Sequence, residues 1–135
     1  MAIPMLHDQD IRTQLRVRLG RLASVEFQRL LCVKGTPAAY VLPNEVMDSA
    51  VNAVQRIVDS PSLMEKFTPS ERDALREFLS VVQSEALRVP FESESVSPEA
   101  LVERDPAWTQ MRASAQQCMK ALGLEISLAE LLERS

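Results

Sequence analysis

Apolar residues recur every three or four positions along most of the chain, a spacing that places them on one face of an α-helix. Four stretches show this periodicity clearly, and between them lie short polar segments that contain proline or glycine. The pattern predicts long amphipathic helices that each bury one apolar stripe. The four stretches are residues 11–22, 46–57, 75–86 and 108–122.

Four prolines directly follow a residue type that commonly caps helices. A Ser, Thr or Asp oxygen can accept a hydrogen bond from a free N–H of the first turn, and proline at the next position has a suitable φ and no N–H to satisfy. Glu71, three residues after Thr68, completes a capping-box sequence. Helices are therefore expected to start at Ser60-Pro61, Thr68-Pro69, Ser97-Pro98 and Asp105-Pro106.

Periodicity and capping signals together predict an all-α fold, a compact multi-helix bundle with short capping helices. At most one short extended segment is expected, near residues 38–42. The first helix begins near residue 8 and either continues to residue 34 or breaks near Ala23 and Ser24. The remaining helices are expected over 44–58, 61–66, 69–88, after Ser97, over 106–122 and after Ser127.

The chain of 135 residues is long enough to form one domain with its own core. We expect residues 1–35 to form a basic helical arm and residues 43–135 to form the core of the bundle. Aromatic residues make up only 4% of the sequence, so the core should be mainly aliphatic. Cys32 and Cys118 are far apart and lack metal-binding spacing, and we expect both to be buried core residues.

The residue types needed for common catalytic sites are scarce. His7 is the only histidine, so a nucleophile–histidine couple or a histidine metal site is not expected. The three glycines are scattered and form no phosphate-binding loop. The sequence therefore predicts a protein that is not an enzyme and uses no cofactor or metal.

Charge is distributed unevenly along the chain. Residues 1–40 contain six basic and three acidic residues and so carry +3, and since the whole chain carries −4, the remaining 95 residues carry −7. An acidic body disfavours nonspecific nucleic-acid binding and suits a basic protein partner. Acidic residues are densest between residues 92 and 105, where Arg104 is the only base.

This acidic segment and the helix that follows it are the predicted partner-binding site. Carboxylates presented together can pair with Arg or Lys of a partner and accelerate its capture. The tryptophan after the Asp-Pro helix start lies on the apolar face of its helix, which favours a core anchor, although the first turn also places it near the surface. The predicted partner-binding residues are Glu92, Glu94, Glu99, Glu103, Asp105 and Trp108.

Two stretches show a combined pattern of helix starts and ends: "PNEVMDSAVNAVQRIVDSPSLMEKFTPSERDALREFLSVVQSEAL" (43–87) and "ERDPAWTQMRASAQQCMKALGLEISL" (103–128). The first stretch contains a helix of about 15 residues, a Ser-Pro break and a second long helix. The second stretch contains a helix that begins at an acidic Asp-Pro sequence and ends at Gly-Leu. This order resembles the small all-helical immunity proteins that neutralise NAD-degrading toxins of bacterial type VI secretion. Residues 1–40 have no counterpart in that pattern, and no toxin-contacting residue can be carried over.

The resemblance implies a non-enzymatic inhibitor that binds a secreted toxin in the cytoplasm and covers its active site. The N-terminus lacks the features of a secretory signal, and no apolar run is long enough to span a membrane. A homodimer is left open.

One alternative function is that of a small acidic secretion chaperone, which would contain several strands. The other is a helical DNA-binding regulator, which would use Arg12, Arg16, Arg18, Arg21 and Arg29.

Overall fold

The computed structural model describes residues 8–34, 41–91 and 96–134, and all regular structure in these ranges is helical. The predicted all-α fold is confirmed. Of the extended segment expected near 38–42, residues 41 and 42 are neither helix nor strand, and the rest lies outside the described residues. The elements are α1 (Asp8–Ala23), α2 (Val25–Gln28), a π-helix η1 (Arg29–Lys34), α3 (Pro43–Val58), α4 (Pro61–Met64), α5 (Pro69–Ala86), α6 (Pro98–Arg104), α7 (Pro106–Ala121) and α8 (Leu128–Glu133).

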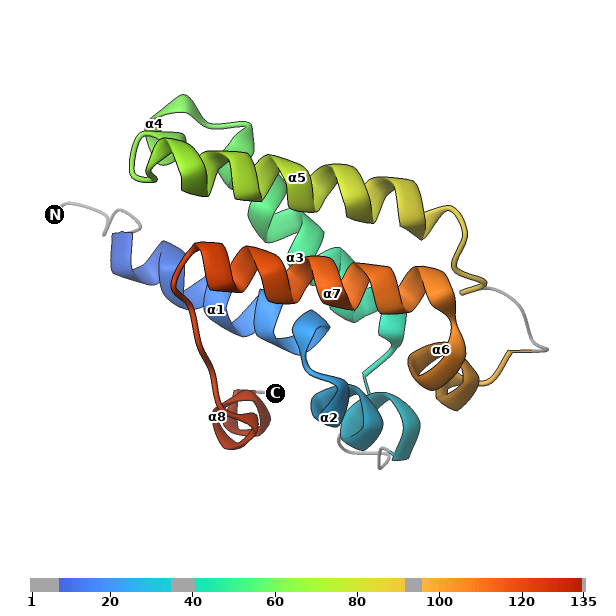
Figure 1. Cartoon of the computed structure of the whole chain (residues 1–135). Coiled ribbons are helices and arrows are strands. Elements are labelled where there is room, and N and C mark those ends of the chain that lie inside the picture. Colours follow the sequence, from blue (N-terminus) through green and yellow to red (C-terminus); the bar gives the residue numbers. More distant parts are fainter. Residues whose placement is uncertain (1–7, 35–40, 92–95, 135) are drawn as a thin grey trace, which may run out of the picture.

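Helix α7 lies between α1 and α5 and packs against both, while α3 crosses behind them and contacts α1 and α5 (Figure 1). The short helices lie around this group of four: η1 packs against α6, and α8 contacts α1 and α2. The apolar faces of all the long helices meet in one continuous core. None of the helices in the described ranges is long and apolar enough to cross a bilayer.

Helix α1 is an integral helix of the bundle, and the expected separation into a basic arm and a core is wrong for residues 8–34. Its apolar residues are buried against α3 and α7 in the same core as the rest of the chain. The basic residues do not make this segment an arm, because an amphipathic helix places them on the opposite face from its apolar stripe. The buried α1 residues include Ile11, Leu15, Leu19 and Leu22.

The predicted capping residues other than Asn44 act as predicted. The Thr68 hydroxyl accepts a hydrogen bond from Glu71 N at 3.2 Å, and the Glu71 carboxylate accepts one from Thr68 N at 3.0 Å, which completes the capping box. Asp105 accepts from the backbone N–H of Trp108 at 2.8 Å. Ser60, Ser97 and Ser127 cap α4, α6 and α8 in the same way.

The start of α2 decides between the two expectations for the first helix, and the start of α3 differs from its expected position. Ser24 separates α1 from α2 and caps the latter by accepting from Phe27 N at 3.1 Å, so the first helix breaks rather than continues. Helix α3 begins at Pro43, one residue before the expected cap Asn44, and Leu42 precedes it without a side-chain cap. Proline has the φ of the first helical turn, which is sufficient to start the helix without a capping side chain.

Candidate functional site

The acidic segment expected to bind a partner is only partly available as a charged surface. Glu92 and Glu94 lie outside the described residues. Glu99 is exposed in the first turn of α6. The other carboxylates of the segment, Glu103 and Asp105, are engaged within the fold.

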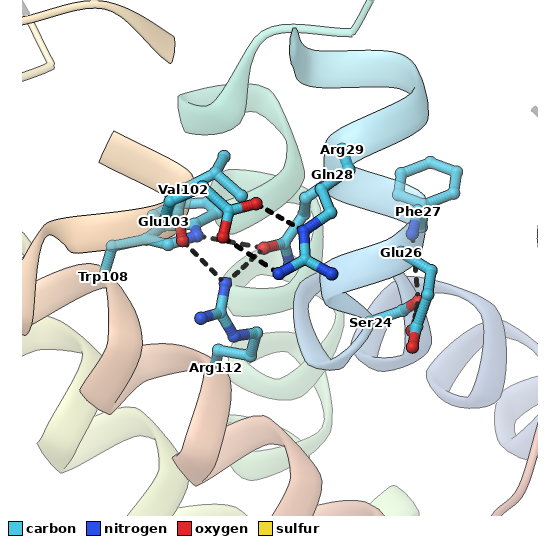
Figure 2. Close-up of polar contacts among 9 residues, drawn as sticks. All are labelled: Ser24, Glu26, Phe27, Gln28, Arg29, Val102, Glu103, Trp108 and Arg112. Atoms are coloured by element: carbon cyan, nitrogen blue, oxygen red, sulfur yellow. Dashed lines mark hydrogen bonds and ion pairs between the residues drawn. The ribbon is translucent and has the colours of Figure 1, made fainter. Parts of the chain in front are cut away.

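Glu103 forms a two-point ion pair with Arg29 of η1. Arg29 Nε donates to one carboxylate oxygen, and Arg29 Nη2 donates to the other at 2.9 Å (Figure 2). The hydrogen bond from Arg29 lowers the pKa of Glu103, and the same bond raises the pKa of Arg29. The pair therefore cancels one charge of the acidic segment and joins α6 to η1.

Trp108 is completely buried, which confirms its interpretation as a core anchor. Its indole Nε1 donates a hydrogen bond to Oε1 of Gln28 at 3.0 Å, and Phe91 packs edge-on against its ring with centroids 6.0 Å apart. A ring with no exposed surface cannot touch a partner, so the prediction that Trp108 contacts one directly is wrong for this structure. Its role is to hold the start of α7 in place.

Gln28 is the centre of a buried polar network that sequence reasoning did not identify. Its side chain has no exposed surface, and its Nε2 donates to the carbonyls of Arg21 at 2.9 Å and Leu22 at 2.7 Å. Its Oε1 accepts from Trp108 and also from Arg112 Nη1 at 3.0 Å (Figure 2). All four hydrogen-bonding positions of the amide are thus occupied, as the burial of a polar group requires.

Arg112 extends this network to α6. The same Nη1 that contacts Gln28 also donates to the carbonyl of Val102 at 3.1 Å. Burial lowers the pKa of Arg112. The network therefore fixes α6, α7 and the α2–η1 junction relative to one another. A sequence signal existed, because Gln28 shares the helical face of the apolar residues Leu31 and Cys32.

A surface hollow of about 480 Å³ lies where α5 ends and α7 begins, and we name it the α5–α7 hollow. Leu87, the residue before one of its lining residues, is 90% exposed, the largest exposed fraction of any large apolar side chain in the described ranges. The wall includes the capping residue Asp105, so part of it is held rigidly. The hollow is lined by Glu85, Arg88, Asp105, Pro106, Ala107 and Gln110.

Both cysteines are buried core residues with free thiols, as predicted. Burial raises the pKa of Cys32 and of Cys118 to about 12. The thiolate is the reactive form, so both side chains are unreactive near neutral pH. Within residues 8–34, 41–91 and 96–134, no group of three or more His, Cys, Asp or Glu residues is placed to hold a metal ion.

Comparison with protein-family models, with curated proteins and with solved structures gives no significant match. The resemblance of residues 43–128 to immunity proteins accordingly stays a prediction.

Proposed function

We propose that this protein is a non-enzymatic inhibitor of the immunity type, which binds a basic secreted toxin domain in the cytoplasm and covers its active site. The observation that carries the proposal is Leu87, an almost fully exposed leucine that directly precedes Arg88, a lining residue of the α5–α7 hollow. Protein interfaces typically combine an apolar centre with a polar, solvent-accessible rim. The toxin class, NAD-degrading or other, rests on the resemblance alone.

The rigidity of this surface supports a binding role. Asp105 caps α7, Pro106 begins it, and the buried Trp108 ring anchors its first turn and contacts Phe91. Side chains that are already ordered lose little conformational entropy when a partner binds. The part of the wall formed by Asp105, Pro106 and Ala107 is therefore ordered before a partner binds.

Charge supports a basic partner. Residues 41–135 carry −7, and the carboxylate of Glu99 is exposed in the first turn of α6. Complementary charge mainly increases the association rate, whereas a buried apolar anchor determines the lifetime of a complex. Leu87 is the proposed anchor, and the acidic residues are proposed to steer the toxin toward it.

The two alternative functions receive less support. A secretion chaperone would contain several strands, and the described ranges contain none. A DNA-binding helix would present its arginines to phosphates, but Arg12 is paired with Glu71 and Arg16 with Glu130. These ion pairs engage two of the four arginines of α1.

The test uses the full chain and the candidate toxin domain encoded nearest to its gene. Binding is measured by biolayer interferometry, and inhibition by the catalytic activity of the toxin domain. Leu87→Asp should weaken binding at least about tenfold, mainly by faster dissociation. The reason is that a charged side chain would replace the apolar side chain that is proposed to be buried in the complex. Leu132→Asp is the matched control, because Leu132 is 38% exposed on α8 and lies outside the α5–α7 hollow.

The possible outcomes distinguish an error in the proposed interface from an error in the proposed function. If Leu87→Asp binds as tightly as the wild type while Leu132→Asp weakens binding, the interface lies at α8 and the assignment of the α5–α7 hollow is wrong. If the wild-type chain neither binds nor inhibits the toxin domain, the immunity function is wrong.

A further inference from the structure

A second hollow, of about 150 Å³, lies between α1, α3 and α4 and shares no residue with the α5–α7 hollow. We name it the α1–α3 hollow. Its floor is apolar, and each of the two long helices contributes a pair of floor residues one turn apart. Leu63 of α4 adds a further apolar side chain. The apolar lining residues are Ile11 and Leu15 of α1, Ala53 and Ile57 of α3, and Leu63.

The remaining lining residues are polar and also come in pairs one turn apart. Gln14 and Arg18 lie on α1, and Asn52 and Arg56 lie on α3. No acidic residue lines the hollow. The polar lining therefore contains two cations and two neutral side chains that can form hydrogen bonds, contributed equally by the two helices.

The arginines of this hollow differ from the other arginines of α1. Arg12, Arg16 and Arg21 each form a hydrogen bond with a distant segment of the fold. Within the described part of the chain, neither Arg18 nor Arg56 forms an ion pair or a hydrogen bond through its side chain. Two guanidinium groups with no ion-pair partner among the described residues therefore line a hollow that has no acidic residue, in a protein of net charge −4.

We propose that the α1–α3 hollow binds a small organic anion, a carboxylate attached to a compact apolar group. An apolar cavity of about 150 Å³ in another protein accommodates benzene, so an aromatic ring matches the size of the floor. Guanidinium groups bind carboxylates through charge-assisted hydrogen bonds. The apolar group would contact the half-buried lining residues Ala53 and Leu63, and the carboxylate would contact Arg18 and Arg56.

Benzoate is the probe that tests this proposal, because it combines a ring of the right size with one carboxylate. The full chain is titrated with benzoate, and binding is followed by the backbone amide shifts of α1 and α3 in NMR spectra. A ligand of this size is expected to bind with a Kd on the order of 1 mM. Benzamide, which has the same shape without the charge, and acetate, which lacks the ring, should each bind at least about tenfold more weakly.

Substitution of the arginines locates the site. Arg18→Gln and Arg56→Gln should each weaken benzoate binding several-fold, with amide spectra that otherwise show the native fold. Arg104→Gln is the matched control, because Arg104 is an exposed arginine on α6 outside the hollow, and this variant should bind like the wild type.

Three results would each overturn the proposal. The first is the absence of saturable shifts in the wild-type chain. The second is equal binding of benzoate and benzamide, which would exclude a contribution from the negative charge even if the arginine variants fail to fold. The third is undiminished benzoate binding in the two folded arginine variants. None of these results bears on toxin binding, since the two hollows have no residue in common.

Discussion

The two ends of α7 are attached to the rest of the protein by different kinds of contact. At the N-terminal end, Trp108 and Arg112 reach a fully buried glutamine, Gln28, and every hydrogen-bonding position of that amide is used. At the C-terminal end of α7, two partly exposed arginines of α1 donate hydrogen bonds to backbone carbonyls. Arg12 donates to the carbonyl of Leu122 at 3.2 Å, and Arg16 donates to that of Glu125 at 3.3 Å.

The difference shows where the position of α7 is determined. A buried hydrogen bond that loses its partner leaves a polar group that water cannot reach, which carries a large free-energy cost. When one residue of a half-exposed ion pair is replaced, water hydrates the remaining charge. Such a pair therefore contributes little to the free energy of unfolding. We therefore expect the N-terminal end, next to the proposed interface, to be the more sensitive of the two.

The largest effect is expected for Trp108→Ala. Removal of a fully buried indole leaves a cavity in the core, and such changes typically destabilise a protein by about 3–5 kcal/mol. The measurement is urea-induced unfolding followed by circular dichroism. Trp108→Phe keeps a ring in the core but cannot donate to Gln28, and it should cost clearly less. Equal destabilisation by both variants would mean that the hydrogen bond, rather than the ring, dominates.

The next largest effect is expected for Gln28→Met, which preserves the shape of the side chain and removes its hydrogen bonds. Trp108 Nε1 would lose its acceptor and two backbone carbonyls would lose their donor, at a cost of about 1–3 kcal/mol. Gln117→Met is the matched control, because Gln117 is exposed on α7. A Gln28→Met variant as stable as the wild type would show that the network contributes nothing to the difference between the two ends.

The smallest effect is expected at the C-terminal end, for Glu130→Gln. Hydrogen bonding to Arg16 lowers the pKa of Glu130, so its contribution to stability is present above the ordinary glutamate pKa of about 4.3 and is lost as the pH falls through the lower folded value. The variant should melt slightly earlier than the wild type at neutral pH, and the two should converge in strong acid. The check is the melting temperature measured across this pH range at low and high salt, since salt should also reduce the difference.

A larger loss for Glu130→Gln than for Gln28→Met would reverse the comparison. It would mean that the arginines of α1, and not the buried network, determine how α7 is held. Leu131 of α8 is buried beside Glu130, so the fold of α8 should be checked in that variant by its amide shifts.

Local signals in the sequence predicted most of the helices. The Thr68–Glu71 capping box and the Asp105 cap involve residues only three positions apart, so their geometry follows from the sequence itself. The apolar periodicity likewise predicted buried residues such as Leu15 and Met111. The start of α3 was predicted two residues late, with Asn44 as the cap in place of Leu42, because Pro43 begins a helix there without a capping side chain.

The candidate site could not be predicted to the same extent. The six predicted residues were chosen by charge and proximity in sequence, but Glu103 is neutralised by Arg29, 74 positions away, and Trp108 is bonded to Gln28, 80 positions away. Partners this distant are brought together only when α2, η1, α6 and α7 pack. The exposure of Leu87 also depends on packing, because a leucine at the end of α5 is equally compatible with a buried position.

The sequence by itself thus determined where helices begin and which face of each is buried, because both depend on residues within a turn or two of one another. The tertiary structure alone decided which charges remain free. Arg18 and Arg56 have no ion-pair partner in the described residues, whereas Arg29 and Glu103 neutralise each other, although all four are ordinary surface charges in the sequence. The reason is physical: the energy of a charge depends on what lies within a few ångströms of it, and packing brings those neighbours together.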